Sequence, residues 1–116
     1  MVKMIIALML SCTFTAYNGT SVQNIQWADG GTYRITCYDV YCNVPQGRQS
    51  ASGKTLEYGD VAMNGVPFGT EISIEGEIFT VVDRCERDDT IDIFIENDSG
   101  YCQCDLLEYK KVMVKR

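Results

Sequence analysis

The chain contains no histidine among its 116 residues. Histidine is the commonest general base and the commonest metal ligand, so its absence excludes a Ser-His-Asp or Cys-His catalytic system. Any acid–base chemistry must use Asp, Glu, Lys, Tyr or Cys side chains. Zinc binding is also disfavoured, because Cys-x4-Cys and Cys-x-Cys are unusual ligand spacings and no histidine completes a set. We therefore expect neither a metal site nor a cofactor.

Basic residues are scarce as well. The chain has 10 Lys and Arg against 16 Asp and Glu, which gives a net charge of −6. A nucleic-acid partner requires a basic face that displaces counterions, and the sequence predicts none. The only basic run, at residues 110–116, is too short to reverse this charge and is typical of a solvated terminal strand.

No apolar run is long enough to span a bilayer. The longest begins after Lys3, covers Met4–Leu10 and is followed by small and polar residues. A charged start, an apolar centre and a polar exit are typical of a secretory signal peptide, which we assign to residues 1–16. Two alternatives remain: a lipoprotein leader with a lipid anchor at Cys12, or a buried N-terminal element. Simple secretion is favoured, so we expect a secreted or cell-envelope protein.

Five cysteines follow the predicted leader. In a small exported domain they predict disulfides rather than free thiols, and the odd number leaves one thiol over unless Cys12 joins. Neighbouring cysteines at 102 and 104 point to the same side of an extended segment, so they should bond to different partners. Our prediction pairs Cys37 with Cys42, and Cys85 with Cys102 or Cys104. Sequence alone leaves the connectivity open.

The rest of the chain predicts one mainly β domain. Residues 17–31 are polar and turn-rich, and we interpret them as a lead-in segment in which Trp27 packs on the domain. Residues 39–56 predict a long loop and Leu106–Tyr109 one helical turn. Alternating apolar residues predict six strands, and six short strands in a small monomer favour a closed barrel over a sandwich, because closure removes exposed edges. The predicted strands are Thr32–Tyr38, Tyr58–Asn64, Glu71–Ile74, Glu77–Asp83, Thr90–Glu96 and Lys111–Lys115.

Two aspartates stand out in the stretch VVDRCERDDTIDIF, residues 81–94. Asp83 and Asp92 lie on the two predicted strands that flank an acidic loop. They could form a catalytic pair, supply half of a metal site, or only cap turns by bonding backbone amides. Asp88 and Asp89 lie in the loop itself and are typical of solvated turn residues.

Five short motifs in a fixed order resemble the three-aspartate (3D) domain family: TYRITCY at 32–38, SASG at 50–53, VAMNGVPFGT at 61–70, VVDR at 81–84 and TIDIF at 90–94. This resemblance covers residues 32–116. It implies a six-stranded double-psi β-barrel, related to lytic transglycosylase A and to the rare lipoprotein A and expansin-like barrels. Two of the three signature aspartates, Asp83 and Asp92, are present. Asn64 takes the place of the remaining one, which is the first of the three in chain order. The glycines of the family's second loop are missing.

What the resemblance implies about function is cleavage of peptidoglycan glycan strands between N-acetylmuramic acid and N-acetylglucosamine. In the transglycosylase form, the muramyl 6-hydroxyl attacks the anomeric carbon, so one carboxyl group can act as acid and then as base. Asp92 is the expected acid/base and Asp83 the supporting carboxylate. Asn64, Ser52 and Lys54 are expected to contact substrate.

Such an acid must keep its proton, so its pKa must lie above about 4, through burial or through a neighbouring carboxylate. Two alternatives stay open beside the enzyme. One is a non-catalytic glycan-binding barrel of the expansin type. The other is a structural or phage-encoded module stapled by disulfides.

Overall fold

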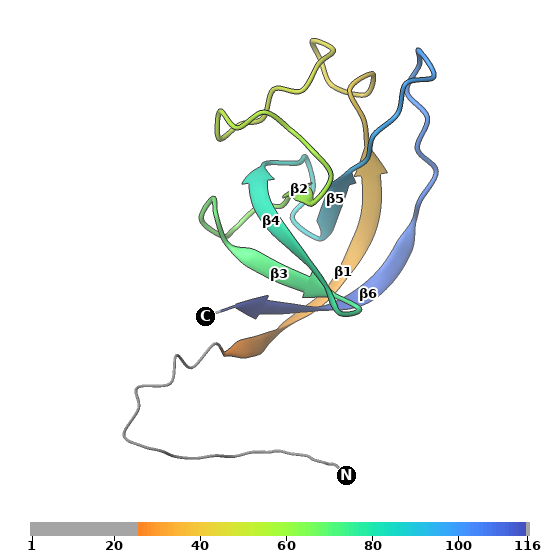
Figure 1. Ribbon diagram of the computed structural model, residues 1–116. Helices are drawn as coiled ribbons and strands as arrows, with labels where there is room; N and C mark the ends of the chain where they lie inside the picture. The colour runs from red at the N-terminus through yellow and green to blue at the C-terminus, as the bar shows by residue number, and fades with distance from the viewer. Residues whose placement is uncertain (1–25, 116) are drawn as a thin grey trace.

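The computed structural model describes residues 26–115 as a six-stranded, all-β fold (Figure 1). The predicted leader at 1–16 and residues 17–25 of the predicted lead-in lie outside the described residues. The strands are β1 (Trp27–Tyr38), β2 (Asp60–Ala62), β3 (Glu71–Ile74), β4 (Glu77–Asp83), β5 (Thr90–Phe94) and β6 (Glu108–Lys115).

The strands close into a barrel in the order β1-β5-β2-β4-β3-β6. Two neighbouring pairs, β1 with β5 and β2 with β4, are parallel, and every other pair is antiparallel. Closure pairs each strand on both sides, so no open edge is left to attract another chain. The predicted closed barrel of six strands, stapled by disulfides, is confirmed; its double-psi crossing stays a prediction.

The β3–β4 hairpin has the bounds that the sequence predicts. Ile74 lies opposite Glu77, so a two-residue turn of Glu75 and Gly76 joins the strands. Both turn residues have a positive φ, 52° and 86°. A turn with two left-handed residues matches the right-handed twist of the strands, which is why a glycine is needed there.

Strand β1 begins earlier than predicted, at Trp27 instead of Thr32. We interpreted Gly30 and Gly31 as part of a turn-rich lead-in, but the register against β6 shifts between Asp29 and Gly31, so they form a β-bulge. A methyl group at Gly30 would lie 2.5 Å from Val114 Cγ2. Glycine is therefore required here by close packing of two strands rather than by a chain reversal.

Other predicted elements differ too: β5 ends at Phe94 instead of Glu96, and β6 starts at Glu108 instead of Lys111. Strand β2 starts only at Asp60, whose carboxylate accepts the Glu57 backbone N–H at 3.0 Å and closes a turn in front of the strand. The helical turn predicted at Leu106–Tyr109 is wrong. Glu108 lies opposite Ile35 in the β1–β6 ladder, so Glu108 and Tyr109 already belong to β6, and Leu106 and Leu107 precede the strand without forming a helix.

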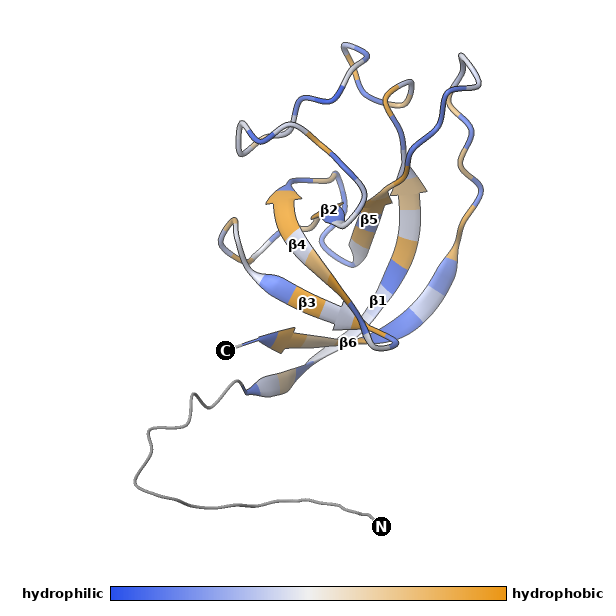
Figure 2. Cartoon of the chain, viewed as in Figure 1, coloured by the Kyte–Doolittle hydropathy of each residue, from blue (hydrophilic) through white to orange (hydrophobic). Residues whose placement is uncertain are grey.

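The apolar residues form two cores, which lie on opposite faces of the same strands. The barrel interior is filled by Ile35, Val61, Met63, Ile72, Ile74, Phe79, Val81, Ile91, Ile93 and Val112. A second core lies under the long loops and comprises Tyr38, Leu56, Ala62, Val82 and Phe94. Figure 2 shows the apolar residues concentrated on the strands and the polar residues on the loops. Because β5 is covered on both faces, Asp92 is its only residue that is not fully buried.

Two disulfides join the end of β1 and the loop that follows it to the segment before β6. Cys37 bonds to Cys104 and Cys42 bonds to Cys102, with Cα–Cα distances of 5.8 Å and 4.8 Å. The predicted Cys37–Cys42 pair and the predicted bond of Cys85 are both wrong, since Cys85 is free. The expectation that residues 102 and 104 bond to different partners is confirmed. The pairing follows from the barrel, which brings the start of one long loop beside the end of another.

A buried carboxylate reinforces this junction. Asp39 is 0% exposed. Its oxygens accept the backbone N–H groups of Tyr41 (2.9 Å), Cys42 (3.1 Å) and Gln103 (3.1 Å), and the Asn97 side-chain amide (2.8 Å). Burial raises the pKa of Asp39, but these donors outweigh burial and hold the pKa below its usual value. Asp39 thus fastens the loop after β1 to the loop before β6.

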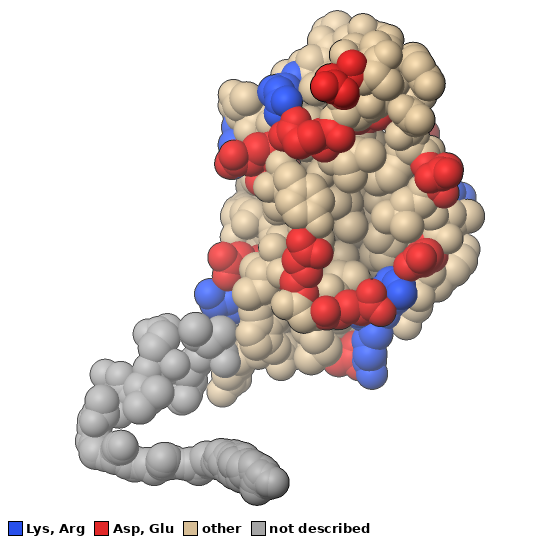
Figure 3. All heavy atoms as spheres, turned by 45° about the vertical axis from the view of Figure 1, so that its right-hand side comes forward, with Lys and Arg blue, Asp and Glu red and all other residues tan. Residues whose placement is uncertain are grey.

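Acidic side chains outnumber basic ones on the face seen in Figure 3, in keeping with the net charge of −6. Such a surface repels a polyanion such as nucleic acid. Within residues 26–115, no helix is long and apolar enough to cross a membrane.

Candidate active site

Four side chains form a row across four neighbouring strands. Thr36 on β1 lies opposite Asp92 on β5, Asp92 lies opposite Ala62 on β2, and Ala62 lies opposite Asp83 on β4. Cross-strand partners point to the same face of a sheet. Here it is the outer face, because the neighbouring Ile91 packs in the barrel interior. The backbones of the two aspartates are therefore about 10 Å apart, two strand spacings, and only a methyl group projects between them.

A β-bulge directs Asp83 toward this row. The β2–β4 register shifts after Val61, which pairs with Val81, so that Ala62 pairs with Asp83. Val81 packs inside the barrel, whereas Val82 packs in the second core. Bulges commonly turn a side chain toward a functional site, and this one places both aspartates on one surface.

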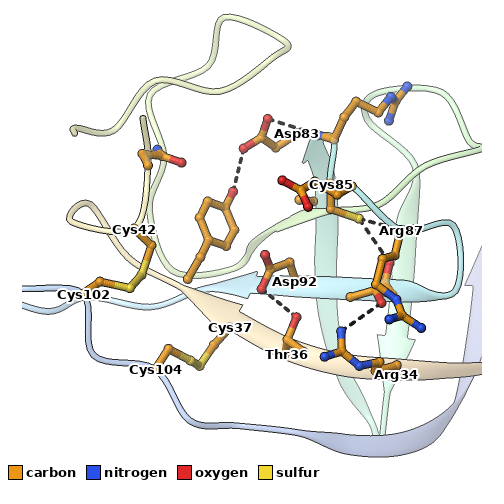
Figure 4. A pocket seen from close by; sticks show the side chains of 16 residues that line it. Arg34, Thr36, Cys37, Cys42, Asp83, Cys85, Arg87, Asp92, Cys102 and Cys104 are labelled. Carbon is orange, nitrogen blue, oxygen red and sulfur yellow. Dashed lines mark hydrogen bonds between the residues drawn. A yellow bond between two sulfur atoms is a disulfide. The ribbon is translucent and has the colours of Figure 1, made fainter. Parts of the chain in front are cut away.

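Both aspartates line one open pocket with a volume of about 420 Å³, between the outer face of the barrel and the loops (Figure 4). This is enough room for a sugar ring. One wall carries both disulfides, and the other carries the loop that follows β4. The lining residues are Arg34, Thr36, Cys37, Tyr38, Cys42, Asn43, Ala62, Asp83, Arg84, Cys85, Glu86, Arg87, Thr90, Asp92, Cys102 and Cys104.

The half-buried Asp92 has the chemistry of an acid. Burial raises the pKa of its carboxyl group, and the negative charge of Asp83 raises it further. The Thr36 hydroxyl donates to Asp92 Oδ1 at 2.8 Å, and this bond and the Arg34 charge oppose the rise without reversing it. A carboxyl group with a raised pKa inside a pocket is suited to donate a proton and to take it back.

The surroundings of Asp83 are different, because three donors surround its carboxylate. Asp83 Oδ2 accepts the Tyr38 hydroxyl at 2.9 Å, and Oδ1 accepts the backbone N–H groups of Ala51 (2.8 Å) and Arg84 (2.9 Å). Burial and the bond to Asp83 raise the pKa of Tyr38, so its hydroxyl stays a proton donor. Asp83 thus holds the 50–54 loop in place while it adds negative charge to the pocket.

Asn64, which stands where the motif resemblance places an aspartate, does not line the pocket. Its Nδ2 donates to the Cys85 carbonyl at 2.8 Å and to Asp88 Oδ1 at 3.0 Å. Its Oδ1 accepts the Cys85 backbone N–H at 3.1 Å. All three bonds fasten the loop after β4, and none involves Asp92.

Ser52 and Lys54 also lie outside the lining of this pocket. The Ser52 hydroxyl is 3.0 Å from that of Ser50. The Lys54 ammonium pairs with Asp60 at 2.6 Å and with Glu57 at 3.1 Å. The SASG loop contributes to the site through the Ala51 backbone, which holds Asp83.

Sequence reasoning missed Arg34 and Thr36. Alternate positions 34, 36 and 38 share one face of β1, which was visible in the sequence. The parallel pairing of β1 with β5 sets that face beside Asp92, and no sequence pattern showed it. Tyr38 on the same face has its ring buried in the second core, and its hydroxyl bonds to Asp83.

The free thiol of Cys85 also lines the pocket. It donates to the carbonyls of Arg87 (3.3 Å) and Thr90 (3.4 Å), and burial raises its pKa. A thiol with a raised pKa is a poor nucleophile. Asp39, Cys42 and Cys102 lie close enough to share a metal ion, but the disulfide removes both thiolate ligands.

Comparisons of this chain with protein-family models, with curated proteins and with solved structures find no match. The function therefore has to be inferred from the site itself, together with the motif resemblance.

Proposed function

We propose that this protein is an exported, peptidoglycan-cleaving enzyme that acts on the glycan strands as a lytic transglycosylase, with Asp92 as its single acid/base. The motif resemblance names the substrate. The two disulfides of the described chain are typical of proteins from oxidising compartments outside the cytosol, which fits a target in the cell wall.

One observation carries the proposal. Asp92 is a half-buried carboxyl group with a raised pKa in an open pocket, whereas the carboxylate of Asp83 is already occupied by three donors. Only one of the two carboxyl groups is therefore free to exchange a proton. A glycosidase that hydrolyses with two carboxyl groups needs both of them free beside the scissile bond. A transglycosylase needs only one.

The chemistry fits this arrangement. Asp92 donates its proton to the glycosidic oxygen as the bond from that oxygen to the anomeric carbon breaks. The 6-hydroxyl of the same muramyl sugar attacks the anomeric carbon, and the Asp92 carboxylate takes the hydroxyl proton. The product is a 1,6-anhydro sugar, no water is consumed, and the enzyme returns to its starting protonation state. Thr36 orients the Asp92 carboxyl group, and burial together with the charge of Asp83 raises the pKa of Asp92.

The test is digestion of purified peptidoglycan, with the soluble products separated and weighed by mass spectrometry. Wild type should release 1,6-anhydromuropeptides. Asp92→Asn should slow release at least about 100-fold, the lower end of what a general acid/base contributes. Asp98→Asn, on an exposed loop, is the matched control and should keep full activity. Products with ordinary reducing ends would instead indicate hydrolysis with external water.

The second candidate function is a non-catalytic glycan-binding barrel, and the contacts of Asn64 favour it. Asn64 stands where the family pattern has a carboxylate, and its side chain bonds only to the loop after β4. The pocket therefore has fewer acidic groups than the family pattern. Binding to peptidoglycan without any released product, in wild type and in Asp92→Asn alike, would support this function and overturn the enzyme.

A further inference from the structure

Arg34 lies one step along β1 from the row that contains Asp92. It pairs with Thr90 as Thr36 pairs with Asp92, and side chains two residues apart share a face. The two positions are about 7 Å apart along the strand. Arg34 therefore reaches the same pocket about one sugar-ring width from the proposed acid.

The guanidinium of Arg34 has donors to spare. Its Nη1 donates to Thr90 Oγ1 at 3.3 Å, and this is its only side-chain hydrogen bond within residues 26–115. An arginine carries five N–H donors, so most of those on Arg34, a residue that lines the pocket, have no protein acceptor within residues 26–115. No carboxylate of the described chain lies within ion-pair distance of it, although Asp92 feels its charge.

The other arginines of the pocket are already engaged. Arg87 makes a two-point contact with Asp89, at 2.9 Å and 2.7 Å. Arg84 donates to the Met63 carbonyl and lies over the Phe68 ring, 3.9 Å from its centre. Arg34 is thus the one pocket arginine of residues 26–115 that is left open for a ligand.

The remaining charges of the pocket are arranged around this cation. Arg87 lies near Arg34 in the pocket (Figure 4). The charge of Arg87 is offset by Asp89, which also accepts the Thr90 hydroxyl at 2.9 Å. Besides Asp92, the other charged groups of the lining are Arg84, Glu86 and Asp83, and Asp83 is held by its own three donors. Asp92 carries no charge when it is ready to act as an acid, and burial raises its pKa.

We propose that Arg34 forms a subsite for a carboxylate on the substrate, so that the pocket selects an acidic glycan over a neutral one. The inference rests on the proposed function. A guanidinium binds a carboxylate through two parallel N–H bonds, which no sugar hydroxyl can match. On peptidoglycan, such a carboxylate is either the lactyl group of a muramyl sugar without its peptide or an acidic group of an attached peptide.

Binding at this subsite also prepares the acid. A carboxylate on Arg34 offsets the charge that lowers the pKa of Asp92 and adds a negative charge near it. Both effects favour the protonated form of Asp92. By linkage, ligand binding and proton uptake by Asp92 strengthen each other, so the ligand should bind more tightly as the pH falls toward the pKa of Asp92.

The experiment uses single sugars, which contain no glycosidic bond and bind without being cleaved. N-acetylmuramic acid, its lactyl methylamide, N-acetylglucosamine and the dipeptide L-Ala-D-Glu are titrated into the wild-type protein and followed by NMR. N-acetylmuramic acid should bind at least about 10-fold more tightly than its methylamide, the factor that corresponds to about 1.4 kcal/mol. The Asp92 side-chain carbon should show a higher pKa in its presence. Preferential binding of the dipeptide would assign the carboxylate to the peptide instead.

Arg34→Gln should remove the preference for the acid, and Arg34→Lys should restore part of it. Arg48→Gln is the matched control, because Arg48 pairs with Glu96 and does not line this pocket. Amide dispersion in each NMR spectrum confirms that the variant is folded. Equal affinity for the acid and its methylamide, or a preference that survives in Arg34→Gln, overturns the subsite.

Failure of the subsite and failure of the enzyme give different results. Anhydro products without any preference for the acid leave the enzyme standing and remove the subsite. A preference for the acid without anhydro products leaves a binding pocket for acidic sugars and removes the enzyme.

Discussion

Asp39 and Asp92 are carboxyl groups that lie under the same loops, yet their surroundings move their pKa values in opposite directions. Burial raises the pKa of Asp39, but its hydrogen bonds prevail and the pKa is lowered. Burial also raises the pKa of Asp92, and the single hydroxyl of Thr36 does not overcome it. The number of donors therefore separates a carboxylate that stabilises the fold from one that is suited to catalysis.

Replacing Asp39 should destabilise the protein at neutral pH. In Asp39→Asn the amide presents N–H groups to donors that need acceptors, so the free energy of unfolding should fall by about 2–4 kcal/mol. A lowered pKa in the folded state means that this contribution is complete above the unfolded-state value, 3.8, and is lost as the pH falls through the folded-state pKa. The contribution of Asp39 to the free energy of unfolding can be measured by urea unfolding at several pH values down to about 3. The proteins compared are wild type, Asp39→Asn and, as a control, the exposed Asp98→Asn. A difference that does not shrink in acid would assign the effect to packing alone.

Replacing Asp92 should have the opposite effect on stability. Its raised pKa means that the charged form is destabilised by folding, so its favourable contribution is present at low pH and is lost as the pH rises through the folded-state pKa. Asp92→Asn removes the charge while its Oδ1 can still accept from Thr36. The variant should therefore unfold about 2–5 °C higher than wild type at pH 7 and show no gain at pH 3. Thermal unfolding of both proteins between pH 3 and pH 7 tests this prediction. A lower unfolding temperature of Asp92→Asn at pH 7 would show that the Asp92 carboxylate stabilises the fold.

Among the elements, the loop after β4 depends on a single amide side chain. Asn64 holds this loop through two donors and one acceptor, directed at Cys85 and Asp88. A carboxylate could not donate to the Cys85 carbonyl and would face the charge of Asp88. The contacts of this loop therefore favour asparagine at position 64, independently of the chemistry of the pocket.

Placing an aspartate at position 64, as the motif resemblance would expect, should destabilise the protein. Asn64→Asp loses both donors and brings two carboxylates together, so the free energy of unfolding should fall by about 2–3 kcal/mol at pH 7, without a gain in peptidoglycan cleavage. Asp88→Asn in the same chain should recover part of the loss, and this double-mutant cycle isolates the repulsion. Unfolding in urea and product release are the two measurements. A faster enzyme with unchanged stability would mean that Asn64 belongs to the site after all.

The sequence predicted those elements whose signal is local. The β3–β4 hairpin was correct because strict alternation and the Glu75-Gly76 pair fix both strands and turn. The start of β1 was missed because Gly30 and Gly31 are identical in sequence to a turn, whereas in the fold Gly30 packs closely on Val114 of β6. Asp83 and Asp92 were identified from their strands, whereas Arg34 and Thr36 depended on which strand β1 adjoins. The disulfides failed for the same reason, since pairing depends on how distant loops meet.

For the molecule as a whole, the two cores define two layers with different kinds of support. The barrel interior is closed by strand pairing on all sides. The second core is covered only by the long loops, which are fastened by two disulfides and by Asp39. The pocket lies between the layers, with a disulfide-bearing wall and a barrel floor. The covering layer, residues 39–57 and 95–107, is therefore the part that shapes the site.

Reducing the disulfides should loosen this covering layer before the barrel. The bonds close loops of 67 and 60 residues in sequence, and each is worth about 2–4 kcal/mol. Hydrogen exchange read by mass spectrometry should show peptides of the covering layer losing protection on reduction, while peptides from β3, β4 and β6 keep theirs. Because burial under these loops raises the pKa of Asp92, that pKa should fall toward its usual value in the reduced protein. Cys85→Ser is the control and should respond as wild type does, since Cys85 is in neither disulfide. Loss of protection in both layers together would mean that the barrel and the covering layer unfold as one cooperative unit.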